Sequence, residues 1–182
     1  TEILSFAVQK FGDDLVLASS FGAEDCALIA LLAEAGLQVR TFFLDTGRLH
    51  QETYETVDRV SRKYKWKVDY YAPRNDTLQE LLKTHGPNGF YNSRDARLAC
   101  CMVRKTEPLK RALSGARAWI TGLRREQATS RTALDLFETD SINGLHKINP
   151  LAHWSTDQLW DFIDTNNVPV NPLHKRGFVS IG

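Results

Sequence analysis

Strand-like and helix-like segments alternate along the chain, and this alternation constrains the fold more than any other feature of the sequence. Short apolar runs typical of buried strands lie at residues 14–20, 38–45, 66–72, 117–122 and, as a late short strand, 145–151. Helix-like patterns lie at residues 25–36, 50–64, 76–85, 100–114 and 155–167. Strands that alternate with helices favour a parallel sheet with helices on both faces. The sequence therefore predicts an α/β, Rossmann-like fold.

Residues at the ends of these segments refine the prediction. We expect Asp25 to cap the first of the helices and Gly36 to stop it. Residues 86–97 are expected to form a loop, and Pro108 is expected to kink the helix over 100–114. Because no internal repeat, low-complexity tract or linker interrupts the pattern, residues 1–182 are predicted to form a single domain.

The charge balance and the apolar runs exclude several classes of partner. Lys and Arg number 23 and Asp and Glu 22, so the net charge of +1 gives no reason to expect nucleic acid. No apolar run approaches the roughly 20 residues that span a bilayer, and the N-terminus lacks the pattern of a signal peptide. We therefore expect a cytoplasmic protein that does not bind a membrane.

Two loops follow predicted strands at the edge where parallel sheets bind ligands. In the first, Ser19, Ser20 and Gly22 can offer hydroxyl and amide groups to a phosphate at a helix N-terminus, although a plain tight turn explains them equally well. In the second, Leu44 can pack on an adenine ring and Asp45 can bond a ligand or cap the next helix. A simple strand-to-helix turn is the alternative for this second loop.

A third loop, over residues 122–131, follows the strand at 117–122 and is rich in arginine. It contains Gly122, Arg124, Arg125 and Arg131. Grouped guanidinium groups suit a phosphate or sulfate because each can bind it through two parallel hydrogen bonds. A solvated surface loop is the alternative, but its position at the ligand edge favours an anion site.

Cys100 and Cys101 stand side by side in a basic segment. Three cysteines are too few for a disulfide scaffold, which favours metal binding or catalysis. Arg97, Arg104 and Lys105 would favour the thiolate form, and two adjacent thiolates can ligate an iron–sulfur cluster. The alternative is a small apolar pair buried at the start of a helix. This alternative fits the third cysteine, Cys26, to which we assign no chemistry.

Six motifs in order give the chain a specific resemblance. They are SSFGAED, FFLDTGRLHQETY, CCMVRKTEPLKRAL, TGLRREQATSR, KINPLAHWSTDQLWDFI and VPVNPLHKRGFVSIG. With them the chain resembles the assimilatory adenylyl-sulfate and phosphoadenylyl-sulfate reductases of the PP-loop superfamily. The resemblance implies an adenine nucleotide alpha hydrolase-like fold. The adjacent cysteines resemble the cluster-bearing adenylyl-sulfate branch.

The resemblance also implies an activity and its cofactor. Members of the family reduce adenylyl sulfate to sulfite and AMP with thioredoxin or a similar dithiol, through an S-sulfocysteine on the enzyme. A 4Fe-4S cluster is expected on Cys100 and Cys101. Of the basic residues, we expect Lys105, Arg125 and Arg131 to hold the phosphosulfate. A homo-oligomer is possible.

His174 and Arg176 precede the end of the printed sequence. They are expected to line the same pocket, or else to order a C-terminal turn. In the family a Cys-x-x-Cys pair and a later catalytic cysteine follow the SIG motif. We therefore expect two further cluster ligands and the nucleophile beyond Gly182, and read residues 1–182 as a nucleotide-binding reductase domain without its catalytic tail.

Three other functions stay open at this point. The nearest is reduction of phosphoadenylyl sulfate by the same chemistry. An ATP-splitting PP-loop enzyme would need a phosphate loop closer to Ser-Gly-Gly-x-Asp-Ser than SSFGAED. The third is a non-catalytic module that binds a nucleotide or a cluster. The departure from Ser-Phe-Ser-Gly, which some relatives carry, also leaves open whether Ser19 or Ser20 contacts the nucleotide.

Overall fold

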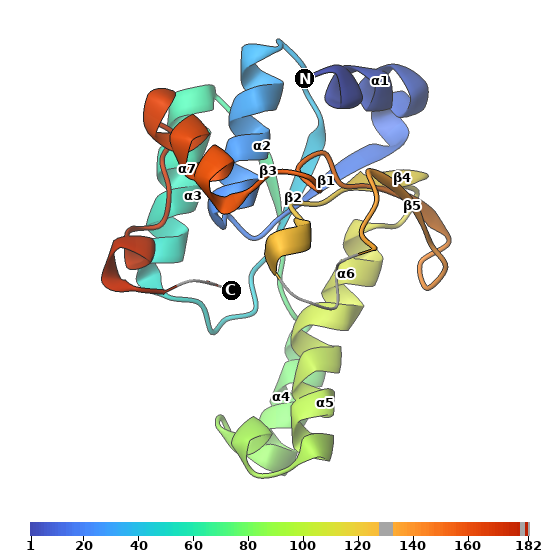
Figure 1. The fold of residues 1–182 in the computed structure, drawn as a ribbon. Coiled ribbons are helices and arrows are strands. Elements are labelled where there is room, and N and C mark those ends of the chain that lie inside the picture. Colours follow the sequence, from blue (N-terminus) through green and yellow to red (C-terminus); the bar gives the residue numbers. More distant parts are fainter. Residues whose placement is uncertain (128–132, 179–180, 182) are drawn as a thin grey trace.

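The computed structural model describes residues 1–127, 133–178 and 181, and its centre is a six-stranded sheet (Figure 1). The strand order is β3-β2-β1-β4-β6-β5, and every neighbouring pair is parallel except β5 and β6. The strands are β1 (Leu15–Ser19), β2 (Arg40–Leu44), β3 (Val68–Tyr71), β4 (Ala118–Ile120), β5 (Phe137–Asp140) and β6 (Leu145–Ile148). The predicted α/β fold with a mostly parallel sheet is confirmed.

Helices cover both faces of this sheet, as predicted. The helices are α1 (Glu2–Phe11), α2 (Ala23–Glu34), α3 (Gln51–Tyr64), α4 (Asn75–His85), α5 (Arg94–Cys101), α6 (Glu107–Ala112) and α7 (Thr156–Thr165). The larger apolar core joins one face of the sheet to α1, α2, α3 and α7. A smaller core packs α6 on the other face, around Val16, Phe42 and Ala112. Helix α2 is the most buried because its residues Cys26 to Ala30 are all apolar.

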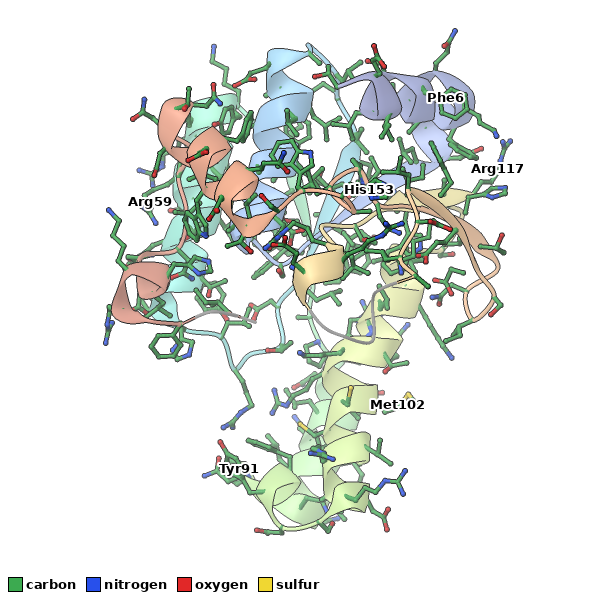
Figure 2. All side chains as sticks on the ribbon, viewed as in Figure 1. Phe6, Arg59, Tyr91, Met102, Arg117 and His153 are labelled. Atoms are coloured by element: carbon green, nitrogen blue, oxygen red, sulfur yellow. The ribbon has the colours of Figure 1, made fainter. Side chains whose placement is uncertain are left out.

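Helices α4 and α5 form a hairpin that projects away from the sheet (Figure 1). Figure 2 shows Tyr91 at its tip and Met102 on its outer side, and both side chains are exposed. The expected loop over 86–97 is therefore only partly correct. It contains a 3₁₀ turn, Gly89–Tyr91, and α5 already begins at Arg94, where the Ser93 hydroxyl accepts a hydrogen bond from the Ala96 amide.

The helix predicted over 100–114 is continuous but changes its geometry before the proline. Residues Met102–Thr106 form a π-helical segment between α5 and α6, and Pro108 lies in the first turn of α6. Proline lacks an N–H and cannot donate to the carbonyl of the preceding turn, and a widened π turn accommodates this loss. The irregularity therefore lies just before Pro108 and takes the place of a kink at it.

Three further details differ from the sequence prediction. The first helix of the βα units begins at Ala23 with Gly22 as its N-cap, so Asp25 is not the cap. Gly36, with a positive φ of 67°, follows the end of this helix, as predicted. Helix α1 and the edge strand β5 were not predicted. Among the described residues, no helix is both long enough and apolar enough to span a bilayer.

Candidate nucleotide-binding site

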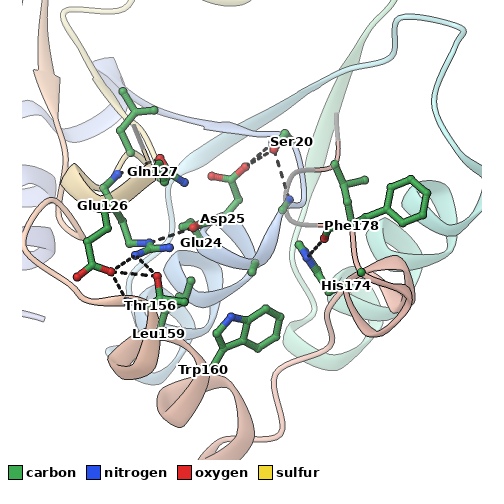
Figure 3. A pocket seen from close by; sticks show the side chains of 17 residues that line it. Ser20, Glu24, Asp25, Glu126, Gln127, Thr156, Leu159, Trp160, His174 and Phe178 are labelled. Carbon is green, nitrogen blue, oxygen red and sulfur yellow. Dashed lines mark hydrogen bonds and ion pairs between the residues drawn. The ribbon is translucent and has the colours of Figure 1, made fainter. Parts of the chain in front are cut away.

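Two neighbouring cavities lie at the carboxyl ends of the central strands. The larger has a volume of about 820 Å³ and is bordered by the N-terminus of α2, the segment after β4, and α7 (Figure 3). The smaller has a volume of about 280 Å³ and lies between β1, β2 and the helix that carries Lys105. Ser20 and Asp25 line both cavities, so they mark the place where the two meet.

The loop after β1 agrees only in part with the phosphate loop that the sequence predicts. The Ser19 hydroxyl accepts a hydrogen bond from the Phe21 amide at 3.2 Å, and Phe21 has a left-handed φ of 58°. Ser19 therefore stabilises the turn and lines only the smaller cavity. Gly22, the N-cap of α2, borders the larger cavity together with Ala23. The amide groups at the start of α2 thus lie at the wall of that cavity, where a helix N-terminus favours an anion.

The smaller cavity has mostly apolar walls. Phe42, Phe43, Leu44, Leu49, Leu109 and Trp119 contribute to it. Lys105 borders this cavity with an exposed side chain. An apolar cavity with a cation among its lining residues suits a nucleobase that carries an anionic chain. Leu44 thus lines this cavity, and its packing against an adenine ring stays a prediction.

Asp45 lines neither cavity. Its Oδ1 atom accepts hydrogen bonds from the Gly47 amide at 2.9 Å and from the Tyr54 hydroxyl at 2.7 Å. Burial, together with this bond to Asp45, raises the pKa of Tyr54 to about 12. These contacts match the simpler interpretation, in which Asp45 orders the turn between β2 and α3.

Asp25 is one of several polar residues at this site that the sequence analysis did not single out as ligand-binding groups. Its side chain is only 7% exposed, and its Oδ2 atom accepts hydrogen bonds from the Ser20 amide at 2.5 Å and the Ser20 hydroxyl at 2.8 Å (Figure 3). Gly122 packs against it so closely that a Cβ there would collide with Asp25 Oδ1 and Glu24 Cβ. Gly122 thus borders the larger cavity because only glycine permits this approach of the strand end to α2.

Arg124 does not lie in a solvated loop. It is 5% exposed, and its guanidinium donates to Glu24 Oε1 at 3.0 Å and to the Trp154 carbonyl oxygen at 3.2 Å. A further bond at 3.4 Å reaches the Thr156 hydroxyl. Arg124 therefore joins α2 to α7 across the floor of the larger cavity.

The other two arginines of this loop lie elsewhere. Arg125 donates to the Leu134 carbonyl oxygen at 2.7 Å and pairs with Asp135 at 3.2 Å, and it lines neither cavity. Arg131 lies outside the described residues. The described part of the loop therefore shows two guanidinium groups bonded to protein partners, and the binding of an anion by this loop stays a prediction.

His174 and Arg176 lie in different surroundings. His174 lines the larger cavity, with its Nδ1 atom 2.9 Å from the Phe178 carbonyl oxygen and its ring 5.3 Å from that of Trp160. Its Nε2 atom is buried and has no hydrogen-bond partner among the described residues. Arg176 instead forms an ion pair with Glu52 at 3.0 Å, outside both cavities. His174 thus lies at the wall of the larger cavity, and its contact with a ligand stays a prediction, whereas Arg176 attaches the C-terminal turn to α3.

The adjacent cysteines lie on the last turn of α5. Cys100 is half-buried, Cys101 is exposed, and both thiols are free. In the part of the chain that the structure describes, no three His, Cys, Asp or Glu side chains come together as a metal site. Cys100 and Cys101 are of the ligand type that an iron–sulfur cluster takes, and they would supply two of the four thiolates that such a cluster requires.

The helix of the cysteines is joined to the nucleotide cavities. Arg104, four residues after Cys100, is buried and donates to the Thr46 carbonyl oxygen at 2.6 Å. Arg48 reaches from the same β2 loop to the Pro87 carbonyl oxygen at 2.8 Å and stacks on Phe90 at 4.7 Å. The projecting hairpin is therefore held against the loop that follows β2, and Lys105 reaches the smaller cavity from the same helix.

Comparison with known proteins identifies the family. The profile of the phosphoadenosine phosphosulfate reductase domain matches residues 14–182. The chain belongs to this family. This membership confirms the resemblance inferred from the six sequence motifs.

Curated relatives align with all or most of the chain. The adenosine 5′-phosphosulfate reductase of Allochromatium vinosum is 49% identical over 181 residues, which cover 100% of this chain and 70% of that protein. The enzyme of the same name from Burkholderia cepacia is 43% identical over 170 residues, covering 93% and 68%.

Solved structures support the same fold. The phosphoadenylyl-sulfate reductase of Candida auris, in a phosphate complex, has a TM-score of 0.86 and 30% identity, covering 100% of this chain and 86% of that chain. The FMN adenylyltransferase of Candida glabrata has a TM-score of 0.67 at 17% identity, covering 96% and 57%. The second likeness shows the fold alone, and both confirm the predicted PP-loop type of architecture.

Proposed function

We propose that the protein reduces adenylyl sulfate to sulfite and AMP in sulfate assimilation. The observation that carries this proposal is the 49% identity with an adenosine 5′-phosphosulfate reductase over 181 residues. The two cavities suit such a substrate in shape. An adenine ring matches the apolar walls of the smaller cavity, and the phosphosulfate then lies near Ser20, Lys105 and the start of α2.

The reaction proceeds through a covalent intermediate. A cysteine thiolate attacks the sulfur of the sulfuryl group, the bond from that sulfur to the phosphate oxygen breaks, and AMP leaves with the electron pair. A thiol of thioredoxin or a similar dithiol then attacks the cysteine sulfur of the resulting S-sulfocysteine, which releases sulfite and forms a mixed disulfide. The second thiol of the reductant attacks this disulfide, frees the enzyme thiolate and leaves the reductant as a disulfide. The basic groups near the phosphosulfate stabilise the charge that develops on the departing phosphate. The dithiol supplies both electrons.

None of the three cysteines is suited to be this nucleophile. Cys26 is buried, and this burial raises the pKa of its thiol well above the ordinary value. Cys100 and Cys101 fit as cluster ligands on the projecting hairpin, where the cluster would supply a local electrostatic field rather than reducing electrons. The nucleophile predicted beyond Gly182 therefore stays a prediction, as do the cytoplasmic location and a homo-oligomer.

Phosphoadenylyl sulfate is the second candidate substrate. The favouring observation is that the family profile and the Candida auris structure carry the name of reductases for that nucleotide. The adjacent cysteines, which the resemblance links to the adenylyl-sulfate branch, favour the first candidate.

Incubation of the full-length protein with adenylyl sulfate and reduced thioredoxin tests the proposal. Sulfite and AMP should appear in equal amounts, and no pyrophosphate should form when ATP is offered instead. Nucleotide binding without sulfite would favour the non-catalytic module and would contradict the proposed reaction.

Lys105 should contribute strongly to the reaction. It borders the smaller cavity with an exposed side chain, so replacement by alanine removes a cation near the phosphosulfate without opening the core. One charged hydrogen bond is worth about 1.5–3 kcal/mol, and Lys105→Ala should therefore lower kcat/KM by roughly ten- to a hundredfold. Steady-state kinetics and a thermal melt measure the two effects separately.

Arg117 provides the matched control for Lys105. It lies beside α1, with its guanidinium over the ring of Phe11 and 3.7 Å from the carboxylate of Asp14, and it lines neither nucleotide cavity (Figure 2). Arg117→Ala should keep kcat/KM near the wild-type value. Equal kinetics for wild type and Lys105→Ala would show that Lys105 does not belong to the anion site.

Arg131→Ala should lower kcat/KM by as much as Lys105→Ala. Arg131→Lys should also lower kcat/KM, because an ammonium group cannot form the bidentate contact.

A further inference from the structure

One carboxylate oxygen binds both hydrogen-bond donors of Ser20. The Ser20 amide and the Ser20 hydroxyl each donate to Asp25 Oδ2, at 2.5 and 2.8 Å (Figure 3). The hydroxyl oxygen in turn accepts a long bond from the Gly22 amide at 3.4 Å. While Asp25 is ionised, both donors of Ser20 are therefore bonded to Asp25, and the hydroxyl of Ser20 presents only oxygen lone pairs to a ligand. An anionic ligand would be repelled by these lone pairs.

The charge of Asp25 has no cation to balance it among the described residues. Asp25 forms none of the ion pairs in the described part of the chain, and the nearby guanidinium of Arg124 is paired with Glu24 at 3.0 Å. Burial raises the pKa of Asp25 from its ordinary value to about 6, and the charge of Glu24 adds to this rise. The titratable and charged groups that share its surroundings or line the two cavities with it are Glu24, Cys26, Lys105, Arg124, Glu126 and His174.

The position of Asp25 exposes a bound nucleotide to this charge. Asp25 and Ser20 line both cavities, so a ligand with its base in the smaller cavity passes them as it extends into the larger one. The 5′-phosphate of a nucleotide lies next to the base and sugar, and it therefore approaches the pair of Asp25 and Ser20. Two negative groups that are buried close together repel each other, and this repulsion favours protonation of one of them.

We propose that Asp25 takes up a proton from solvent when the anionic nucleotide binds, so that the Ser20 hydroxyl can turn from Asp25 to the anion. Asp25 is then a positioning residue, which acts on the ligand through Ser20. This inference rests on the proposed function, since it assumes that the site binds an adenine nucleotide. It adds a proton-coupled step to binding, and no covalent bond forms or breaks in it.

Binding of AMP at several pH values tests the proposal. Free Asp25 titrates near pH 6, so the wild-type affinity should be highest below that value and should fall as the pH rises above it. Asp25→Asn cannot ionise and should lose this fall. The ratio of the wild-type Kd to the Asp25→Asn Kd should therefore grow about tenfold between about pH 5.5 and about pH 8, if binding raises the pKa of Asp25 by about one unit. The ionisation of AMP itself is the same for both proteins and cancels in the ratio.

Calorimetry in buffers with different heats of ionisation provides the direct readout. At about pH 7 the wild type should take up more protons per AMP than Asp25→Asn, which a purely structural role would not produce. Asp58→Asn is the matched control, because Asp58 is an exposed carboxylate paired only with Arg62, and it should behave as wild type. If Asp25→Asn fails to fold, Ser20→Ala replaces it and should weaken AMP binding mainly at low pH.

Two results would overturn the inference. If Asp25 bonds the nucleotide directly as a carboxylate, the wild-type affinity rises with pH and Asp25→Asn binds more weakly throughout. If proton uptake is equal in wild type and Asp25→Asn, Asp25 does not titrate on binding. In both cases AMP still binds and the proposed function stands. Absence of AMP binding by the wild type would instead overturn the proposed function together with the inference.

Discussion

Replacement of Cys101 by serine should leave the full-length protein with almost no iron or inorganic sulfide. We expect anaerobically purified wild type to contain about four irons per chain, held by Cys100, Cys101 and two thiolates beyond Gly182, as in four-cysteine clusters. Cys101 is exposed on the last turn of α5, so serine in its place changes the ligand and little else. Chemical analysis of iron and sulfide, with the visible charge-transfer band, measures the loss.

Cys26 supplies the control for this experiment. It is buried in α2, where its thiol donates weakly to the Phe21 carbonyl oxygen at 3.5 Å, far along the chain from the other two cysteines. Cys26→Ala should retain the full iron content. Wild-type protein without iron, sulfide or the visible band would contradict the proposed cluster, and an unchanged iron content in Cys101→Ser would remove Cys101 from its ligands.

Replacement of Arg124 by alanine should unfold the protein at a clearly lower temperature. Arg124 is 5% exposed and its removal leaves the carboxylate of Glu24 largely buried without its partner. Breaking a buried ion pair in this way costs about 3–5 kcal/mol, which corresponds to roughly 10 °C in Tm for a chain of this size. Thermal melts followed by circular dichroism measure the change in Tm.

Two further variants separate the ion pair from general damage. Arg62 forms an exposed pair with Asp58, and Arg62→Ala should shift Tm by no more than a degree or two because such pairs contribute about 0.5 kcal/mol. The double variant Glu24→Gln with Arg124→Met removes both charges of this buried ion pair and should recover much of the lost stability. Equal melting of wild type and Arg124→Ala would show that Arg124 is not a structural residue.

Arg124 also shows what a local sequence pattern cannot decide. The run LRREQ is typical of a solvated loop or an anion site, and both interpretations were open. Its partners Glu24 and Thr156 lie 100 and 32 positions away in the sequence, so only the assembled fold brings them to Arg124. The helix and strand periods predicted the sheet and the two loops at its edge because these depend on short-range patterns.

Asp25 and β5 were missed for different reasons. An aspartate before an apolar helix predicts a cap, but the side chain of Asp25 bonds backwards to Ser20 because the helix begins two residues earlier, at Ala23. Strand β5 has the sequence FETD, whose two acids give no apolar run, and it is stable only as an edge strand paired with β6. Ser20, Gly22 and Leu44 were predicted at the cavities because the segments that carry them lie at the ends of strands, whereas Lys105 was predicted from its position after the cysteine pair.

The preference between the two nucleotides tests the central claim most directly. Steady-state kinetics of the full-length protein with reduced thioredoxin should give kcat/KM for adenylyl sulfate and for phosphoadenylyl sulfate under the same conditions. We predict that the value for adenylyl sulfate is higher, by at least about tenfold, because the adjacent Cys100 and Cys101 resemble the cluster-bearing adenylyl-sulfate branch of the family. Comparable values, or a higher value for phosphoadenylyl sulfate, would contradict the assignment as an adenylyl-sulfate reductase.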